Sequence, residues 1–264
     1  MKFKKLTSAF LVIVMMLALF AIAPSASAVT DQVSLIYAEH YTVSSGGVPP
    51  YSFNVGAKGV IEVENLGYSK LVTVHYRFID STGAGSSWYD TSASYYQTLV
   101  TGKEAWSFTT GTQNSGYRGT VKVEFAIKYE VNGQEYWDNN GGQNYKVFSG
   151  GWGEQSYMAI GTAGLKVEPN PSAYSNTLSG AIQLVNYDYS KVVTIRYTTD
   201  NWATYNDASA TYYSTISGTG LERWTFSVPL PTGTTSVQFA ASYTVSGTTY
   251  WDNNFGDNYT VNIY

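Results

Sequence analysis

The chain contains two copies of one sequence pattern, and this repeat limits its possible folds more than any other feature. Residues 59–76 match residues 180–197 at 9 of 18 positions, and residues 129–145 match residues 243–259 at 11 of 17. A pattern repeated over this length predicts two copies of one structural unit. The chain is long enough for each unit to be an ordinary domain with its own core.

Within each copy, apolar residues recur at every second position rather than at helical spacing. In the segment 121–130 the alternating apolar residues are Val121, Val123, Phe125, Ile127 and Tyr129. A period of two predicts antiparallel strands with one face on a core and the other in water. Many short strands in a unit of this size favour an all-β sandwich. We place the first unit at 33–148, a linker at 149–164 and the second unit at 165–264.

The first 28 residues have the three parts of a secretion signal. A lysine-rich start precedes an apolar run at 10–23 and the cleavage pattern Ala-Ser-Ala at 26–28. The apolar run is short for a membrane span. We therefore predict a signal peptide at 1–28 and a secreted, extracellular protein that is not held in a membrane.

Composition narrows the class of ligand. The formal net charge is −4 before the predicted signal removes three lysines, so nucleic acid and anionic membrane surfaces are poor partners. No cysteine is present, so the fold rests on its core and not on disulfides. Only 13% of residues are charged, whereas 16% are aromatic. Tyr, Trp and Asn beyond the needs of a core suggest a neutral, hydroxyl-rich ligand.

Turn chemistry places one tryptophan of each copy on the solvent face. Asn132-Gly133 is a strong signal for a two-residue hairpin, and Ser246-Gly247 stands at the same place in the second copy. Counting outward from such a turn pairs Trp137 with Lys128 and puts Trp251 on the same face of its copy. A three-residue turn would reverse this parity, and a covering loop would bury both indoles, so these two alternatives stay open.

An ordered set of motifs occurs in both copies and covers each nearly end to end. In the first copy it is Asn65-x-x-Tyr68-Ser-Lys70, Trp88, Trp106-x-Phe108, and Tyr136-Trp137-Asp138-Asn139-Asn140 through Asn144-Tyr145. In the second copy it is Asn186-x-x-Tyr189-Ser-Lys191, Trp202, Trp224-x-Phe226, and Tyr250-Trp251-Asp252-Asn253-Asn254 through Asn258-Tyr259. This set resembles the starch-binding carbohydrate-binding modules of family 21, which occur in fungal glucoamylases and in glycogen-targeting subunits of protein phosphatase 1.

The resemblance implies an all-β fold of two immunoglobulin-like antiparallel β-sandwich modules in tandem, without catalytic activity, cofactor or metal. It also implies two glucan sites in each module. The first site would use Trp88 with Trp137, and Trp202 with Trp251. The second site would centre on Tyr68 and Tyr189, supported by Asn65, Lys70, Asn186 and Lys191. Fungal modules add a strand aromatic to the first site, where this chain has Ala126 and Ala240.

Asparagine amides suit a sugar because they both donate and accept hydrogen bonds. Turn-making is their alternative role, and it is equally favoured for Asn140 and Asn254. Lys70 and Lys191 have the alternative role of solvated charges, and Asp138 and Asp252 suit a loop-bracing role. We expect sugar contacts from Asn139, Asn140, Asn144, Asn253, Asn254 and Asn258.

The predicted partner is an α-glucan polysaccharide (starch, amylose, glycogen or maltooligosaccharides), bound by both modules at once for avidity. A separate secreted amylase is a further expected partner, whereas an exported chain would not meet the phosphatase of the glycogen-targeting relatives. A hydrolase is the first rival, but the copies share few acidic residues, and His40 and His75 have no counterparts. A protein-interaction or structural module of immunoglobulin-like fold is the second rival.

Overall fold

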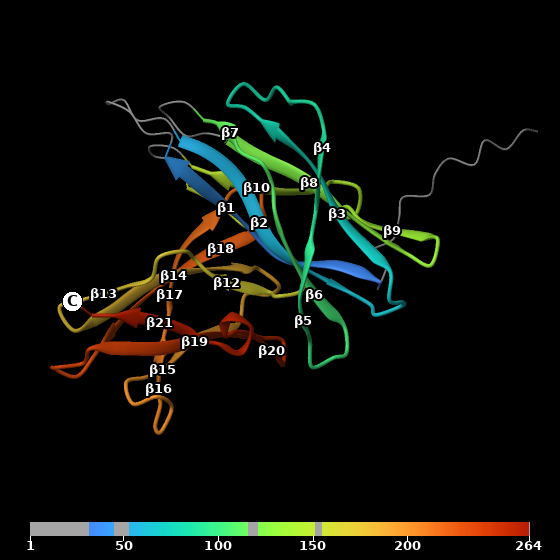
Figure 1. Ribbon diagram of the computed structural model, residues 1–264. Helices are drawn as coiled ribbons and strands as arrows, with labels where there is room; N and C mark the ends of the chain where they lie inside the picture. Colours follow the sequence, from blue (N-terminus) through green and yellow to red (C-terminus); the bar gives the residue numbers. More distant parts are fainter. Residues whose placement is uncertain (1–31, 45–52, 116–120, 151–154, 264) are drawn as a thin grey trace, which may run out of the picture.

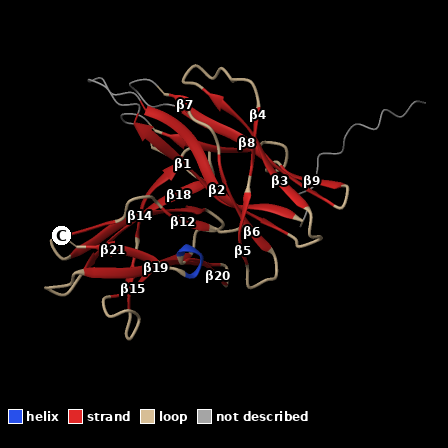
Figure 2. Cartoon of the chain, viewed as in Figure 1, coloured by secondary structure: helices blue, strands red, loops and turns tan. Residues whose placement is uncertain are grey.

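The structure is a computed structural model that describes residues 32–44, 53–115, 121–150 and 155–263. The predicted signal peptide lies outside these ranges. Within them the regular structure is almost wholly β-strand, and the one helical segment, η1, is a 3-10 turn at Asn254–Gly256. The strands form two bodies that follow one another along the chain (Figures 1 and 2).

The first body, which we call module one, is a sandwich of two antiparallel sheets. Its strands are β1 (Val33–Ser44), β2 (Phe53–Val63), β3 (Lys70–Ile79), β4 (Tyr89–Ser92), β5 (Ser94–Thr98), β6 (Glu104–Thr109), β7 (Gln113–Asn114), β8 (Val121–Val131), β9 (Gln134–Asp138) and β10 (Tyr145–Ser149), with β11 (Ala159–Ile160) added at one edge. One sheet has the order β11-β1-β2-β6-β5, with β7 also on β2, and the other has the order β10-β8-β3-β4, with β9 on β8.

The second body, module two, repeats this arrangement. Its strands are β12 (Leu165–Val167), β13 (Ser172–Tyr174), β14 (Thr177–Val185), β15 (Lys191–Thr198), β16 (Asn206–Ser209), β17 (Thr211–Ile216), β18 (Leu221–Pro229), β19 (Ser236–Val245), β20 (Thr248–Asp252) and β21 (Tyr259–Asn262). The sheet orders are β12-β14-β18-β17, with β13 on β14, and β16-β15-β19-β20, with β21 on β19. The predicted all-β fold of two tandem antiparallel sandwiches is confirmed.

The core of each module is built from the apolar faces that the alternation predicted. All five apolar residues predicted along 121–130 are buried on β8. Tyr129 and Tyr243 are fully buried, and their hydroxyls donate to the backbone carbonyls of Glu64 and Val185 at 2.7 and 3.0 Å. A buried tyrosine contributes a large apolar surface and still satisfies its polar atom, so these rings add core without an unpaired group.

The segment between the modules is hydrogen-bonded to both of them. β11 pairs with β1, and the Gly161 N–H donates to the Ile36 carbonyl at 3.0 Å. Toward module two, the Met158 N–H donates to Oε1 of Gln183 at 3.0 Å. Gly161 has no room for a side chain, since a Cβ there would lie 2.0 Å from the Leu35 carbonyl oxygen. The described part of the predicted linker is thus attached to both modules along its length.

Two classes of feature are absent from the described part of the chain. None of its helices has the length and apolar character to cross a membrane. Nor do three or more of its His, Asp or Glu side chains come together as a possible metal site.

Candidate functional site

The hairpins that carry Trp137 and Trp251 have the predicted two-residue turn. Asn132 and Gly133 have φ of 51° and 73°, the left-handed values that a type I′ turn requires. The register then pairs Trp137 with Lys128 in module one, and Trp251 with Ser242 in module two. Both indoles therefore stand on the face away from the core, as predicted. Trp251 is 47% exposed and Trp137 is half-buried.

In module one, Trp137 belongs to a ring cluster with His75 and Trp88, which we call the first face of module one. The His75 ring is parallel to the Trp88 ring, with centroids 4.6 Å apart, and lies edge-on to Trp137 at 6.4 Å. His75 Nδ1 is 2.6 Å from an Asp90 carboxylate oxygen, and the Arg77 guanidinium lies 4.7 Å from the Trp88 ring. His75 thus links the tryptophan before β4 to the tryptophan on β9.

Module two has an arginine at the place of His75, and we call Arg196, Tyr205 and Trp251 the first face of module two. The Arg196 guanidinium lies 4.2 Å from the Tyr205 ring and 5.5 Å from the Trp251 ring. It donates two hydrogen bonds of 2.8 Å to Asp207, and these bonds hold the pKa of that carboxyl below its usual value. A planar cation held by a carboxylate fork is a rigid spacer between two rings.

By strand register Tyr205, not Trp202, is the counterpart of Trp88, and a sugar contact by Trp202 stays a prediction. Asp90 and Asp207 hold equivalent places on β4 and β16, and the residue two positions before each is Trp88 in module one and Tyr205 in module two. Trp202 lies in the preceding turn, with φ of 66° and a buried indole nitrogen that has no hydrogen-bond partner in the described residues. The turn is shorter in module two, so a gap-free comparison of the sequences hides the match to Tyr205.

The two alanines at the place of the fungal strand aromatic do not form an open floor. Ala126 is the register partner of His75, and Ala240 is that of Arg196. Both alanines are buried, with exposures of 5% and 4%. Each first face therefore consists of two rings and one bracing side chain, His75 or Arg196.

The Asn loops at 138–145 and 252–259 have matching turn geometry. Asn139 and Asn253 accept hydrogen bonds from a glycine N–H three residues on, at 2.9 and 3.1 Å. Asn140 and Asn254 have positive φ, and their amides donate to backbone carbonyls four residues on. Turn-making thus occupies the side chains of Asn139, Asn140, Asn253 and Asn254. Asn144 and Asn258 have positive φ, and the Asn144 amide donates to Glu124 at 3.2 Å.

Asp138 and Asp252 brace the Asn loops, as predicted. Asp138 is 1% exposed and accepts hydrogen bonds from the Leu35 N–H and the Tyr145 hydroxyl, both at 2.8 Å. Asp252 does the same with the corresponding backbone N–H and tyrosine hydroxyl of module two, at 2.8 and 2.6 Å. Because each carboxylate joins an Asn loop to the strand that opens the module, it sets where the loop starts.

These tyrosines make the stability of the fold fall at alkaline pH. Burial, and then the charge of the bound aspartate, raises the pKa of Tyr145 and Tyr259 well above the usual value of 10.0. The unfolded chain loses these protons first, so the free energy of unfolding falls as pH rises above 10. We expect a loss of about 1 kcal/mol per tyrosine over the next pH unit. Urea unfolding from about pH 9 to 11 tests this: the Tyr145→Phe/Tyr259→Phe variant should lose less stability than the native chain, and equal losses would contradict it.

A second exposed surface surrounds the Tyr-Ser-Lys motif. Tyr68 and Tyr189 stand in solvent, with relative exposures of 104% and 98%. The Lys70 ammonium donates to Asn65 at 2.7 Å and to Glu104 at 2.8 Å, and its side chain is only 5% exposed. The corresponding lysine of module two, 3% exposed, makes the same two contacts, with Asn186 and Glu222. Lys70 and Lys191 are therefore neither solvated charges nor open to a ligand, and they anchor the loop that carries the tyrosine.

Sequence reasoning missed one exposed ring beside each tyrosine loop. Tyr95 and Tyr212 are 53% and 49% exposed and lie edge-on to Trp106 and Trp224, at 6.2 and 6.0 Å. The Trp106 indole donates to Glu104, the same carboxylate that binds the Tyr68 loop. We call Tyr68 with Tyr95, and Tyr189 with Tyr212, the second faces. A signal was present, because Ser-Ala-x-Tyr-Tyr occurs at 92–96 and again at 209–213.

Both modules match the same protein family. The model of the carbohydrate/starch-binding module, family 21, matches residues 53–148 and residues 166–262. The chain belongs to this family. The resemblance predicted from the motifs of the two copies is thus confirmed.

Individual relatives agree with the family. Glucoamylase 1 of Rhizopus oryzae is 43% identical over 89 residues, which cover 33% of this chain and 14% of the glucoamylase. Protein phosphatase 1 regulatory subunit 3C of Xenopus tropicalis is 36% identical over 85 residues, which cover 32% of this chain and 38% of the subunit. The solved starch-binding domain of Rhizopus oryzae glucoamylase, in complex with β-cyclodextrin and maltoheptaose, shares 34% identity, with 36% of this chain and 90% of the domain covered and a TM-score of 0.31. The chain spans well under half the length of these two curated relatives.

The family sets the class of this protein. Both matched regions are carbohydrate-binding modules, which bind and do not catalyse, and the relatives include protein phosphatase 1 regulatory subunits. The prediction that it is not an enzyme is confirmed, and the hydrolase rival is set aside.

The comparisons contradict the expected extracellular localisation. Protein phosphatase 1 regulatory subunits recur among the relatives, from Xenopus tropicalis and Bos taurus. Residues 1–28, on which the secretion signal was predicted, lie outside the described part of the chain. A module shared with such subunits gives no support to export, and an apolar start does not by itself decide where a chain works. The prediction of a secreted protein is not retained.

Proposed function

We propose that the protein binds α-glucan chains such as starch, glycogen and maltooligosaccharides through the first and second faces of both modules. The observation that carries the proposal is an indole held on the solvent side of a rigid hairpin at the same register position in both modules. A large aromatic ring left open to water on a strand needs a partner to cover it. The apolar face of a glucose ring, which is flat and rimmed by hydroxyls, is such a partner.

The first faces supply the stacking. Trp251 is exposed and is held by Arg196, so it offers a ring whose orientation is fixed before the sugar arrives. In module one the ring cluster is closer, because His75 lies against Trp88 and meets Trp137 edge-on. Module two therefore presents the more open indole, and we assign it the larger share of the binding.

The second faces supply another contact in each module. Tyr68 and Tyr95 are both exposed, and one buried carboxylate, Glu104, connects the elements that carry them. Tyr189 and Tyr212 repeat the arrangement around Glu222. Tyrosine combines a flat ring with a hydroxyl that donates and accepts hydrogen bonds, so a pair of tyrosines can follow the curved surface of an α-glucan chain.

Two modules on one chain convert the second contact into an intramolecular one. Each face is shallow and buries little of a sugar, so a single module binds weakly. If one glucan chain engages both modules, the apparent affinity rises by roughly 10²–10⁴-fold without any new kind of contact. This avidity explains why a duplicated module is useful to a polysaccharide-binding protein.

The test is direct binding to amylose and glycogen by isothermal titration, repeated at about 1 M NaCl, where charges are screened beyond roughly 3 Å. We expect binding at both salt concentrations, because stacking on neutral sugar involves no charge. A β-linked glucan of equal length is the control, since its straighter chain does not match the same faces. Binding that disappears in high salt, or that is equal for the β-linked chain, would refute the proposal and favour a charge-driven protein contact.

A further inference from the structure

The Asn loops of the two modules share their backbone but differ at one position. Module one has Gly141, with φ of 64°, where module two has Phe255, with φ of 57°. The left-handed region suits glycine, whereas a bulky side chain is unfavourable there. Neighbouring positions keep the same geometry, with the Asn144 and Asn258 N–H groups donating to the carbonyls of Asn139 and Asn253 at 2.7 and 2.8 Å. Phe255 thus takes a conformation that its own side chain disfavours.

The Phe255 ring reaches across to module one. Its centroid is 6.2 Å from that of Tyr37 on β1 and 5.4 Å from that of Tyr96 on β5, the latter edge-on at 77°. Tyr96 is the extra residue where the pairing of β5 with β6 shifts register, so this bulge turns its ring away from the regular alternation. Aromatic contacts at these separations are favourable, and they explain what holds Phe255 in place.

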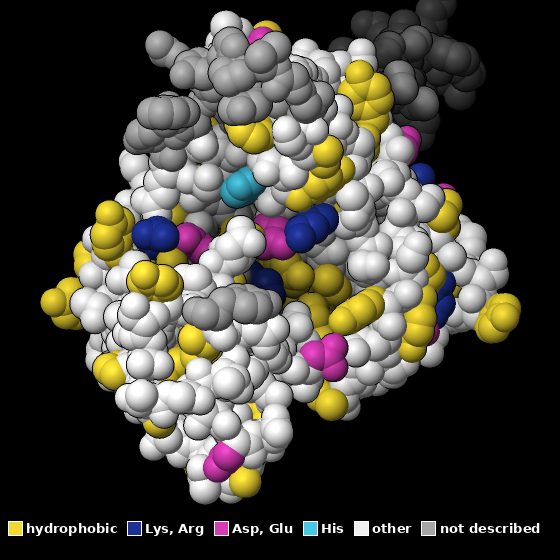
Figure 3. Space-filling model, turned by 60° about the vertical axis from the view of Figure 1, so that its left-hand side comes forward, with side chains coloured by type: hydrophobic (Ala, Val, Ile, Leu, Met, Phe, Trp, Pro, Cys, Tyr) yellow, Lys and Arg dark blue, Asp and Glu magenta, His cyan; other side chains and the backbone are white. Residues whose placement is uncertain are grey.

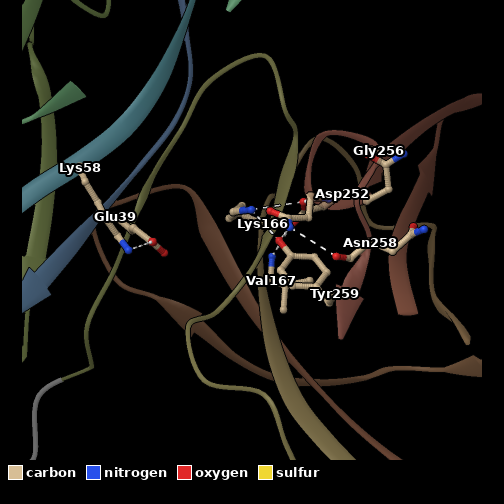
Figure 4. A network of polar contacts seen from close by, with 10 residues as sticks. Glu39, Lys58, Lys166, Val167, Asp252, Gly256, Asn258 and Tyr259 are labelled. Carbon is tan, nitrogen blue, oxygen red and sulfur yellow. Dashed lines mark hydrogen bonds and ion pairs between the residues drawn. The ribbon is translucent and has the colours of Figure 1, made fainter. Parts of the chain in front are cut away.

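Lys166 makes a second link at the same junction. Its ammonium donates to Asp252 at 3.2 Å and to the Tyr259 hydroxyl (Figure 4). The same ammonium lies 4.3 Å from the Tyr37 ring of module one, so it joins β1 to the base of the Asn loop. Its side chain is 7% exposed. A buried ammonium needs both its carboxylate and its hydrogen bonds, so the contact depends on Asp252 keeping its position.

On the module-two side, the junction is made by residues in which the two copies differ. In module two, Lys166 directly precedes Val167, whose N–H donates to Asp252. In module one the equivalent N–H is that of Leu35, and the residue before it is Ser34. Phe255 replaces glycine in the same way. Because Lys166 and Phe255 both contact module one and both differ from their counterparts there, they form a surface that is specific to this contact.

Beside these contacts the surface is hollowed into a groove of about 730 Å³ with walls from both modules (Figure 3). Glu39 and Lys58 pair at 3.1 Å on the wall from module one (Figure 4), and Asn254 and Tyr259 line the wall from module two. The groove is therefore a consequence of the two modules being held side by side at a defined distance.

We propose that Phe255, with Lys166, is a positioning residue that locks the two modules into one rigid body and fixes the angle between their glucan-binding faces. The Asn loop of module two serves in this contact rather than as a sugar site. The inference deepens the proposed function, because fixed faces need no ordering when one glucan chain engages both modules.

The orientation can be measured without any sugar. The chain contains no cysteine, so a Thr101→Cys/Thr232→Cys pair, one in an exposed turn of each module, can carry spin labels for pulsed electron resonance. We expect a narrow distance distribution in the native background and a broad one after Phe255→Gly, which installs the residue that module one tolerates at this place. Lys166→Ser should act in the same direction. Tyr174→Ala, which removes a ring that is 79% exposed, is the control and should leave the distribution narrow. A distribution that stays narrow in Phe255→Gly would overturn the inference.

Binding then tests the consequence separately from the proposed function. Phe255→Gly should bind maltoheptaose as the native chain does, because one short oligosaccharide occupies one face. Its affinity for long amylose should fall by about tenfold, because both modules must then be ordered on binding. An unchanged affinity for amylose with a broadened distance distribution would overturn the positioning role. Absence of amylose binding by the native chain would instead overturn the proposed function and leave the distance result standing.

Discussion

Replacing Trp137 and Trp251 by alanine together is expected to abolish retention of the protein on insoluble starch while both sandwiches stay folded. Stacking on one flat ring contributes on the order of 1–3 kcal/mol by analogy with base stacking. Losing one ring in each module also removes the avidity of the pair, so the apparent affinity should fall by about 10²-fold or more. Sedimentation of the protein with starch granules measures the retained fraction directly.

The single variants refine this expectation. Trp251→Ala should weaken binding more than Trp137→Ala, because Trp251 is 47% exposed whereas Trp137 is half-buried beside His75. Tyr174→Ala is the matched control, since it removes another exposed ring outside the proposed faces. Urea unfolding curves should show that all variants remain folded. Full retention of the double variant would rule out the first faces as glucan sites.

Strand pattern and turn chemistry were readable from the sequence because both are local. The alternation along 121–130 defined which side of β8 is buried, and Asn132-Gly133 defined the register of the hairpin. Parity in a strand is strict, so a known turn length decides the face of every side chain that follows. The position of Trp137 and Trp251 away from the core follows from these two facts alone.

Features that depend on register between distant strands were not readable in the same way. Tyr205 takes the place that was assigned to Trp202, because the turn before it is shorter in module two. Tyr95 and Tyr212 were visible as a repeated Ser-Ala-x-Tyr-Tyr, but only the pairing of their strands shows that they meet Trp106 and Trp224.

Burial of charge and contacts between modules also lay beyond the sequence. The ammonium groups of Lys70 and Lys191 were assigned to solvent or sugar, whereas each is bonded to a glutamate on the neighbouring sheet. Nothing in the sequence distinguishes Phe255 except that the other copy has a glycine at this position. The partner of such a residue is set by the path of the whole chain, which short motifs do not encode.

The buried ion pair of Lys70 with Glu104 gives the largest expected effect on stability. The side chains are 5% and 12% exposed and lie 2.8 Å apart, and Glu104 also accepts a hydrogen bond from the Trp106 indole at 3.0 Å. Removing the lysine alone leaves a carboxylate with little access to water, so Lys70→Met should lower the free energy of unfolding by about 3 kcal/mol. Lys128→Met is the control: its carboxylate partners Glu130 and Glu135 are 38% and 50% exposed and stay hydrated without the lysine, so the loss there should be within about 0.5 kcal/mol.

A compensating variant separates the charge from the packing. In Lys70→Met/Glu104→Gln the amide oxygen can still accept the Trp106 hydrogen bond, but no unpaired charge remains, so the double variant should regain roughly half of the lost stability. Urea unfolding of the native chain, Lys70→Met, Glu104→Gln and the double variant measures this coupling as a double-mutant cycle. The Tyr68 loop loses its anchor in both lysine variants, so both should bind glucan less well at the second face even where stability is restored. A double variant as unstable as the single one would show that the lysine acts through its packing, and the charge would then have no role in holding the loop.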